Sequence, residues 1–458
     1  MGRPERLGTP VLKTGEPLQN LKQAFIYAPR ENFMKTSDAE KVASKFKFIK
    51  GESPTTELEW PIGGETIRKA LGESLNAKNV SFLIGAGCSS SWKDNTEMGV
   101  PTMAPLSKEF LEEKAVPNDS FPTQAERQFL LQHFGINLSK PEFSQNLERL
   151  MEVLFSLRFI LKKSASDDAT TKLGVVNSLI AKVQTYLWSK CTSGAFSNGN
   201  NTVLNLYMTF YKKLVLRDRA LPRPWVFTTN YDLFNETAMD VLGIPFFNGF
   251  SGVVERRFNP STFRYALAEQ LDLTTRKWTA VDAFVYLCKL HGSVSWTEDS
   301  EDGRWLFPIR EVSGDTEPKR VMIYPTPAKQ SSALASPYSD LIREFQTRVV
   351  REQSVLFTLG YAFGDEHLNN IIYQALTIPT FRLVIFADPE STGEIAKLRS
   401  LNDPRIWIIG GDGPSEGNKA HYFETIVQEF MPERPSERID DAVKKVIQTM
   451  SPDSGSEN

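Results

Sequence analysis

A glycine-rich turn is the first feature of the sequence whose residue types could do chemistry. Residues 79–84 are mostly apolar, and Gly85, Ala86 and Gly87 follow them directly. Glycines allow a tight turn after a strand and let the backbone approach a pyrophosphate, whose charge the following N–H groups can satisfy. The hydroxyl of Ser89 would add a donor. A purely structural turn remains the alternative for this segment taken alone.

The spacing of this turn disfavours an ordinary hydride-transferring dehydrogenase. The dinucleotide fingerprint of such enzymes has a third glycine where this chain has Ser90, and an acidic residue on a second strand about 20 residues further on. Glu109 lies near that distance, but it falls in a helical pattern that follows two prolines.

A second group of polar residues ends the apolar run at 225–228. Asn230 and Asp232 follow it in the segment Thr-Thr-Asn-Tyr-Asp. In open parallel sheets the ligand lies outside the carboxyl ends of the strands. An asparagine can donate and accept, which suits a ribose hydroxyl or a water. The alternative is that Asn230 caps the helix expected at 231–242.

A histidine ends the next apolar run, at 286–290. His291 is one of only four histidines and precedes Gly292. A neutral imidazole at a strand end could act as a base or orient a hydroxyl near pH 7. The alternative is a structural histidine.

Three later apolar runs end in the same way. Gly360 follows one, with Asp365 at the start of the next helical pattern, and Asp388 follows another. Asp365 could cap that helix or hold a ribose, and Asp388 is placed to hold a ribose hydroxyl. The run Gly-Gly-Asp-Gly at 410–413 is either a plain turn or part of an adenine pocket. The repetition of this pattern at successive strand ends predicts one ligand site more strongly than any single motif.

The elements that would position these residues alternate between strands and helices. Unbroken apolar strands predict an α/β fold, a Rossmann-like parallel sheet with helices on both faces. Five helical patterns predict a helical insertion subdomain at about 105–220. Residues 1–62 are expected to be an N-terminal extension that could serve oligomerisation, and 433–458 a C-terminal helix and disordered tail. The expected strands are 79–84, 225–228, 286–290, 321–324, 355–359, 383–386 and 406–409.

Composition excludes several classes of protein. The formal net charge of the 458 residues is -3, which gives no electrostatic reason to expect nucleic acid as the main ligand. The three cysteines lie far apart, so neither a zinc site of the usual spacing nor a disulfide framework is expected. No run approaches the roughly 18 apolar residues of a membrane helix. We therefore expect a soluble, cytoplasmic protein.

The order of these motifs resembles the sirtuin family. Gly85-Ala-Gly-x-Ser, followed by Gly-Val-Pro at 99–101, is similar to the family's glycine-rich NAD loop. Thr-Asn-Tyr-Asp at 229–232 is similar to its Gln-Asn-Ile-Asp segment, and Leu-His-Gly at 290–292 to its catalytic His-Gly. Gly360 and Asp388 occupy the places of later ribose-contacting motifs.

The resemblance implies a role for each matching residue. Asn230 would fix the nicotinamide ribose and a water, and His291 would act as the base. Asp232 would contact the nicotinamide carboxamide. Residues 63–432 would form the sirtuin-like NAD-binding catalytic domain. The expected cofactor-binding residues are Gly85, Ala86, Gly87, Ser89, Pro101, Asp232, Gly360, Asp365 and Asp388, with the pyrophosphate on Ala86, Gly87 and Ser89.

Two departures separate the chain from sirtuin deacylases. Those enzymes carry Asp-Phe-Arg after Gly-x-Pro, whereas here Thr-Met-Ala follows at 102–104, and their four-cysteine zinc module is missing. The pattern is more similar to the zinc-less, sirtuin-like NAD+ hydrolases of bacterial anti-phage defence. That resemblance implies NAD+ as substrate, nicotinamide and ADP-ribose as products, no metal, a homo-oligomer, and a partner such as a HerA-type ATPase. A non-catalytic sensor of NAD or an ADP-ribose derivative, and a protein deacylase, are the alternatives.

Overall fold

A computed structural model describes most of the chain between residues 44 and 433. All described residues belong to one compact unit, which comprises Ala43–Asn458. Most of the expected N-terminal extension, and nearly all of the expected C-terminal helix and tail, lie outside the described residues. These are 44–51, 54–93, 96–113, 120–164, 166, 168–194, 201–272, 277–281, 283–298, 309–312, 320–322 and 336–433.

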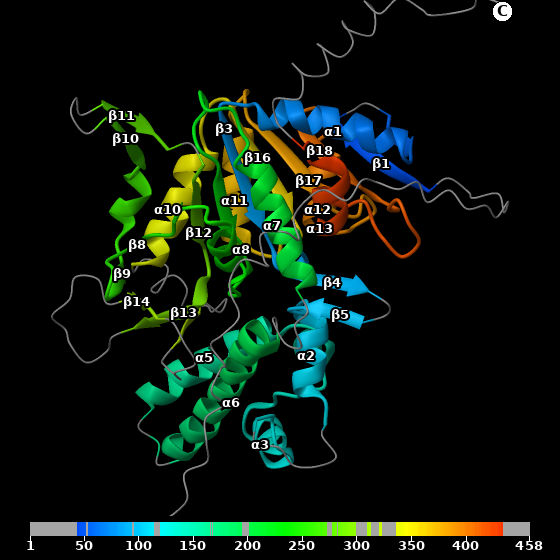
Figure 1. Ribbon diagram of the computed structural model, residues 1–458. Helices are drawn as coiled ribbons and strands as arrows, with labels where there is room; N and C mark the ends of the chain where they lie inside the picture. Colours follow the sequence, from blue (N-terminus) through cyan, green and yellow to red (C-terminus); the bar gives the residue numbers. More distant parts are fainter. Residues whose placement is uncertain are drawn as a thin grey trace, which may run out of the picture. The chain divides into compact units, whose positions relative to one another are not determined.

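A nine-stranded sheet is the centre of the fold (Figure 1). Seven neighbouring strands, from β18 to β7, pair in parallel, and β1 and β2 complete one edge in antiparallel pairing. The spatial order is β2 (Thr56–Glu59), β1 (Lys45–Lys50), β18 (Ile406–Gly411), β17 (Arg382–Phe386), β16 (Ser354–Leu359), β3 (Asn79–Ile84), β6 (Trp225–Thr228), β12 (Val285–Lys289) and β7 (Phe246–Phe247).

The order of the strands reverses between β3 and β16. The chain proceeds from β3 to β6 and β12 on one side, then returns to add β16, β17 and β18 on the other. In sheets of this kind the crevice at the carboxyl ends beside such a reversal is where ligands bind. The predicted α/β fold, a mostly parallel sheet between helices, is confirmed.

Both faces of the sheet are buried, as its unbroken apolar strands require. Successive residues of a strand point to opposite faces, so Phe82 and Ile84 belong to one core and Leu83 to the other. The first core is completed by α1 (Ile62–Leu75), α7 (Thr202–Leu214), α8 (Phe234–Leu242) and the short helices α13 (Phe423–Thr425) and η5 (Ile426–Phe430). The second is completed by α10 (Tyr338–Val349), α11 (Glu366–Leu376) and α12 (Glu394–Ser400).

A helical module is inserted between β3 and β6, after the hairpin of β4 (Ser90–Lys93) and β5 (Thr96–Gly99). In Figure 1 its helices lie beyond the edge of the sheet toward which β3 runs. The last inserted helix, α7, differs from the others because it covers the sheet, with Phe210 packed edge-on against Phe82 at 5.2 Å. The module consists of α2 (Met103–Leu111), α3 (Gln124–Phe134), α4 (Pro141–Ser144), α5 (Leu147–Lys163), α6 (Ala169–Ser189) and η2 (Lys190–Gly194).

A smaller antiparallel sheet follows β12. The φ of +89° at Gly292 turns the chain out of the parallel sheet immediately after His291. The strand expected at 321–324 belongs here: its described part pairs with β13 and not with the parallel sheet. The members are β15 (Arg320–Met322), β13 (Gly292–Glu298), β14 (Ile309–Glu311), β9 (Arg256–Phe258) and β8 (Phe250–Ser251); β10 (Ala268–Asp272) and β11 (Lys277–Ala280) form a separate hairpin, and η4 (Pro260–Arg264) precedes it.

The N-terminal edge of the sheet differs from the expected domain boundary. We expected residues 1–62 to lie outside the core, but β1 pairs with β18 and β2 pairs with β1. Phe46 is 1% exposed and packs against Trp60 and Phe430. The alternation of lysine and phenylalanine at 45–48 is the period-two pattern of a half-buried strand.

None of the helices in the described part of the chain is both long enough and apolar enough to cross a bilayer.

Candidate active site

Two glycine-containing loops meet where the strand order reverses. The backbone N–H of Gly85 donates to Leu359 O at 2.9 Å, and that of Gly87 donates to Gly360 O at 3.0 Å. A Cβ on Gly85 would lie 2.5 Å from Gly360 O, and one on Gly360 would lie 2.6 Å from Cys88 N. No side chain fits between backbones this close. The glycines are therefore required by the packing of the two loops, with or without a ligand.

Asn230 is fixed against the first of these loops. Its Nδ2 donates to Gly85 O at 3.0 Å and to Ser89 Oγ at 2.8 Å, and its side chain is largely buried. Both N–H bonds of the amide are thus used, which leaves Oδ1 to interact with a ligand. Asn230 does not cap the next helix, because α8 begins at Phe234 and its N-cap is Leu233.

Ser89 is the centre of a buried polar cluster. Its Oγ donates to Asp232 Oδ2 at 2.6 Å, accepts from Asn230, and lies 3.2 Å from the hydroxyl of Tyr207. Because the single proton of Ser89 goes to Asp232, the Tyr207 hydroxyl must be the donor in the third contact. Burial raises the pKa of Tyr207 well above its usual value, so this hydroxyl keeps its proton.

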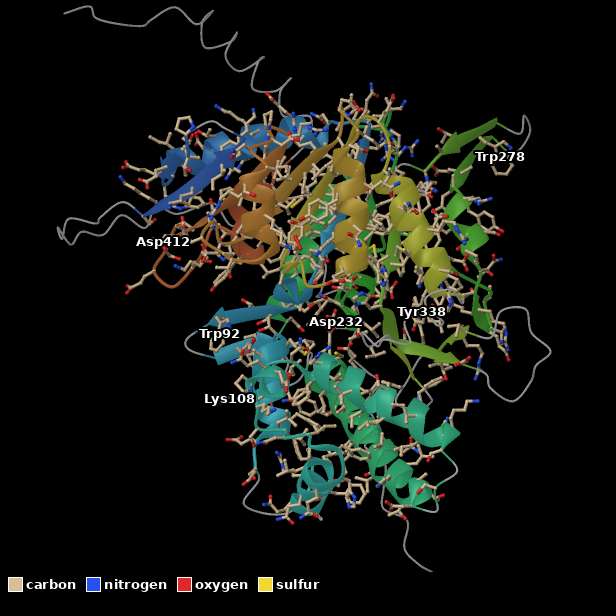
Figure 2. The ribbon with its side chains drawn as sticks, turned by 180° about the vertical axis from the view of Figure 1, so that it is seen from behind. Trp92, Lys108, Asp232, Trp278, Tyr338 and Asp412 are labelled. Atoms are coloured by element: carbon tan, nitrogen blue, oxygen red, sulfur yellow. The ribbon has the colours of Figure 1, made fainter. Side chains whose placement is uncertain are left out.

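This cluster changes what Ser89 and Asp232 can do. We expected the Ser89 hydroxyl to face a pyrophosphate. Ser89 is 1% exposed, however, and its hydroxyl already contacts Asp232, Asn230 and Tyr207. Asp232 is 2% exposed, and its Oδ1 accepts from Phe234 N at 3.2 Å. Both residues therefore hold Asn230 in place. Figure 2 shows Asp232 at the junction between the sheet and the helical module.

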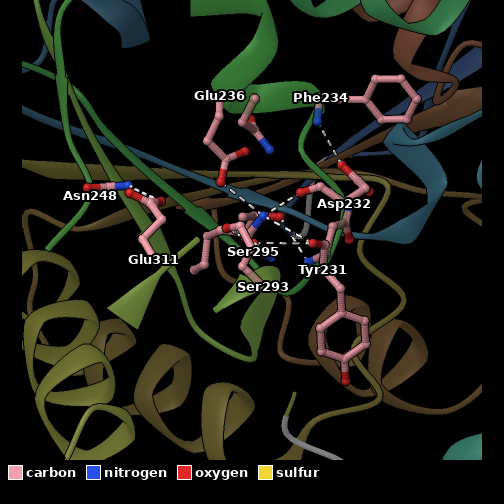
Figure 3. A network of polar contacts seen from close by, with 12 residues as sticks. Tyr231, Asp232, Phe234, Glu236, Asn248, Ser293, Ser295 and Glu311 are labelled. Carbon is pink, nitrogen blue, oxygen red and sulfur yellow. Dashed lines mark hydrogen bonds and ion pairs between the residues drawn. The ribbon is translucent and has the colours of Figure 1, made fainter. Parts of the chain in front are cut away.

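A buried lysine ties the Asn230 loop to the strand that carries His291. The Nζ of Lys289 donates to Tyr231 O at 3.3 Å and to Asp232 O, and lies 3.0 Å from Glu236 Oε1 (Figure 3). The contact with Glu236 is an ion pair but not an aligned hydrogen bond. Burial raises the pKa of Glu236, and the charge of Lys289 opposes that rise.

His291 is paired with an aspartate from the loop after β16. Its Nε2 lies 3.0 Å from Asp365 Oδ2, and each side chain is 12% exposed. The other carboxylate oxygen accepts from the backbone N–H of His367 at 2.8 Å and of Leu368 at 3.2 Å, which caps α11. Of the two roles considered for Asp365, capping is observed. The contact with His291 was not expected.

The pairing with Asp365 determines how the imidazole of His291 can react. A carboxylate oxygen accepts a hydrogen bond, so Nε2 carries the proton and, in the neutral ring, Nδ1 is the acceptor. The ring is also held in one orientation, as a base needs to be.

The strand register brings these groups to one edge of the sheet. Thr228 of β6 pairs with Lys289 of β12, and Asn230 and His291 each follow two residues later. Leu290 N donates to Thr228 O at 2.8 Å, so the strands are still joined where they end. The Gly85 turn contacts Asn230, and the loop that begins at Gly360 contacts His291 through Asp365.

Residues 224–406 match the family model of the SIR2-like domain. The matched stretch runs from β6 to β18 and contains Asn230, His291 and Asp365; the Gly85 turn precedes it. The match supports a sirtuin-like relationship for this part of the chain, and with it an NAD-related function. No curated protein matches the chain.

A solved structure of a mutant Sir2 homologue in complex with ADP ribose also aligns with the chain. The identity is 11% and the TM-score 0.28, over 84% of this chain and 99% of that chain. This likeness is too weak to assign a residue or an activity.

Two expected ligand-binding residues lie apart from the cluster. Asp388 lies two residues after the end of β17, inside the SIR2-like stretch. It is exposed and accepts from the backbone N–H of Glu390 at 3.0 Å. Pro101 is half-buried between β5 and α2, next to Val100, whose N–H donates to Ser89 O. Among the described residues, no hydrogen bond joins the Asp388 side chain to Asn230 or His291. Ala86, by contrast, is exposed at the tip of the turn.

The side chains of the described residues were also compared with the ligands of a metal centre. No group of three or more His, Cys, Asp or Glu side chains among the described residues could hold a metal ion. All three cysteines are buried and unbridged.

Lys289, Glu236 and Tyr207 are the site residues that sequence reasoning missed. Lys289 did carry a signal in the sequence, because it is a lysine at the end of an otherwise apolar strand. A charged side chain is almost never fully buried unless it is paired, so its position indicated buried partners. Glu236 and Tyr207 lie in ordinary amphipathic helices and gave no such signal.

Proposed function

We propose that the protein is an NAD+ glycohydrolase, which cleaves the nicotinamide–ribose bond of NAD+ to give nicotinamide and ADP-ribose. The observation that supports this best is the pair of strand-end residues Asn230 and His291 in the SIR2-like stretch. Each is held by a side chain or loop from elsewhere in the sheet, and both lie at the edge where the strand order reverses.

The chemistry follows from the two atoms that remain available. The bond between the ribose C1′ and the nicotinamide nitrogen breaks, and its electron pair leaves with nicotinamide. Asn230 Oδ1 orients a water or a ribose hydroxyl, and the water oxygen bonds to C1′. His291 Nδ1 takes the proton that this oxygen loses. The carboxylate of Asp365 stabilises the imidazolium that forms, as a fixed charge placed where charge develops.

The remaining residues take binding or positioning roles in this proposal. In this proposal Ala86, exposed at the tip of the turn, faces the pyrophosphate, and half-buried Gly87 lies beside it with its N–H already bonded to Gly360 O. Gly360 allows the two loops to approach. Ser89 and Asp232 position Asn230. A carboxamide contact by Asp232 would have to share the lone pairs that already accept from Ser89 and Phe234. Pro101 and Asp388 would border the more distant parts of NAD+, with Asp388 near a ribose.

The biological setting is a further part of the proposal and rests on the resemblance to sirtuin-like defence NAD+ hydrolases. We propose that the protein acts in the cytoplasm as a homo-oligomer and depletes NAD+ in anti-phage defence. A HerA-type ATPase is the proposed kind of partner. We also propose that the reaction requires no metal ion.

Release of nicotinamide from NAD+ by the purified full-length chain tests the activity. We expect Asn230→Ala and His291→Ala each to lower turnover at least about 100-fold, since each removes a group that acts on the reacting atoms. Matched controls are Asn205→Ala and His133→Ala, which change exposed residues of α7 and α3. Melting temperatures show whether each variant is folded.

Three outcomes would contradict the proposal. Full activity of both site variants would remove Asn230 and His291 from the reaction. Saturable binding of NAD+ without nicotinamide release, in the chain alone and with candidate partners, would favour the sensor. Strict one-for-one consumption of NAD+ with an acetylated peptide would favour a deacylase.

A further inference from the structure

The loop between β16 and α11 contains a buried aromatic residue in an unusual backbone conformation. Phe363 has a φ of +57°, in the left-handed region that bulky L-residues rarely adopt. Gln353 and Asn402 share this feature in the described part of the chain, but both are exposed. Phe363 is 4% exposed and lies two residues before Asp365, the partner of His291. A residue in such a conformation persists only where its surroundings hold it.

Asn369, in the first turn of α11, makes a contact that holds this backbone. Its Nδ2 donates to Phe363 O at 2.8 Å, and the residue is 4% exposed. This hydrogen bond fixes the peptide unit that follows Phe363, and the orientation of that unit determines where the next residues of the loop point. Because the bond is buried, its loss would leave the Phe363 carbonyl without this partner.

A tyrosine fixes the orientation of the same amide. The hydroxyl of Tyr361 donates to Asn369 Oδ1 at 3.2 Å and lies 3.5 Å from Asp365 O. Burial raises the pKa of Tyr361, so the hydroxyl keeps its proton and can donate. The ring of Tyr361 packs against that of Phe363, with centroids 5.0 Å apart. The Asn369 amide is therefore held at its oxygen as well as at its nitrogen.

Both contacts of Asn369 act on the few residues that lead to Asp365. Asp365 is the N-cap of α11, where one of its carboxylate oxygens accepts from backbone N–H groups of the helix. The other oxygen lies 3.0 Å from His291 Nε2. The cap fixes the first of these oxygens. The place of the second also depends on the path of the loop, and the conformation of Phe363 determines that path.

We propose that Asn369 is a positioning residue of the candidate active site, which acts by holding Phe363 in its left-handed conformation. The loop then presents the Asp365 carboxylate to His291, so Asn369 supports the pair from behind and takes no part in the reaction itself. Its importance for turnover rests on the proposed NAD+ hydrolysis, whereas its effect on the contact between Asp365 and His291 does not.

The Nε2–H proton of His291 gives a test that does not require catalysis. This proton donates to Asp365, and its exchange with water is slow only while that hydrogen bond is kept. NMR of the full-length chain, labelled with ¹⁵N at its four histidines, detects the signal, and its absence from His291→Ala assigns it. Asn369→Leu should raise the exchange rate at least about tenfold. The melting temperature shows whether the variant is folded.

Asn370→Leu is the matched control, because it makes the same substitution at the next residue of α11, which is exposed. Its exchange rate should equal that of the wild type. Wild-type exchange in Asn369→Leu, or equally fast exchange in both variants, would overturn the proposal. If Asn369→Leu does not fold, Tyr361→Phe decides, because it removes one hydroxyl and keeps the ring. Its exchange rate should rise at least about threefold, and an unchanged rate would overturn the proposal.

Steady-state kinetics of nicotinamide release show whether Asn369 acts through Asp365. Asn369→Leu should lower kcat at least about tenfold and leave KM within about threefold of the wild-type value. The double variant Asn369→Leu/Asp365→Asn should be no slower than Asp365→Asn alone, because both changes break the same contact. Losses that multiply would overturn the proposal. A wild-type chain that releases no nicotinamide would refute the hydrolysis only, and the exchange rates would still decide the role of Asn369.

Discussion

The pairing of His291 with Asp365 is the contact on which the proposed chemistry depends most directly. A carboxylate at this place does two things at once, since one oxygen caps α11 and the other holds the imidazole. The two functions of Asp365 can be separated by experiment, because asparagine caps a helix about as well as aspartate but carries no charge.

Asp365→Asn should therefore lower kcat for nicotinamide release about 100-fold or more while KM and the melting temperature change little. The asparagine amide can present an N–H to His291, which favours the tautomer with Nε2 unprotonated and leaves no acceptor at Nδ1. Steady-state kinetics and thermal denaturation on the same preparation measure both effects. An unchanged kcat, or a fall in stability that accounts for the lost activity, would contradict a positioning role for Asp365.

At the residue scale, sequence identified the strand-end groups but not their partners. Asn230 and His291 stand directly after apolar runs, and that placement is visible in the sequence. The bond between Ser89 and Asp232 spans 143 residues, and the contact between His291 and Asp365 spans 74. Such contacts depend on strand order and register, which a single sequence does not contain. This is also why Ser89 was expected to face the ligand.

At the scale of elements, the loops after β3 and β16 behave as one unit. Gly360→Ala should destabilise the protein by about 2 kcal/mol or more, because its φ is +58° and the new Cβ would meet the backbone of Gly87 and Cys88. Urea denaturation measures the loss. Nicotinamide release should fall too, since the Gly85 turn must move away.

Gly364→Ala is the control for that substitution, in the same loop. A Cβ on Gly364 would have no heavy atom within 4 Å, and the φ of Gly364 is not in the left-handed region. We expect its stability to match or slightly exceed that of the wild type. If both alanine variants lose the same stability, the close approach of the two loops is not the reason for the glycine at 360.

The elements that sequence predicted are those with unbroken apolar runs or long amphipathic patterns. Six of the seven predicted strands, from 79–84 to 406–409, are present in the parallel sheet, as are the inserted helices. The seventh, at 321–324, pairs in its described part with β13 of the antiparallel sheet. Strands of two or three residues, such as β8 and β9, are too short to show a period. The alternating residues of β1 did carry a signal, but their charge and the neighbouring prolines made the segment resemble a tail.

At the scale of the whole molecule, β3, β6 and β12 run between two edges of the parallel sheet, one at their amino ends and one at their carboxyl ends. Gly85, Asn230 and His291 follow the carboxyl ends of β3, β6 and β12, whereas a cavity lined by Asn79, Trp225 and Tyr286 lies at their amino ends. The buried pair of Lys289 and Glu236 lies near the edge at the carboxyl ends. Its burial makes the stability of the whole fold sensitive to one charge.

Lys289→Met should destabilise the protein by about 3–5 kcal/mol near pH 8, since it leaves Glu236 buried without its cation. Chemical denaturation across a range of pH measures this, and the double variant Lys289→Met/Glu236→Gln is the control. The second substitution removes the unpaired charge, so it should restore part of the lost stability.

The sign of the pH dependence distinguishes this explanation from a simple packing defect. Burial raises the pKa of Glu236 in the folded state above its unfolded value, and loss of Lys289 removes the main interaction that opposes the rise. Between those two pKa values the folded state binds more protons than the unfolded state, so stability falls as pH rises through that window. The deficit of Lys289→Met should thus be smallest near the unfolded pKa of about 4.3 and grow toward pH 8. In the double variant this slope should disappear, whereas a deficit that is equal at all pH values would mean that Lys289 stabilises the fold through its hydrogen bonds to Tyr231 and Asp232 alone.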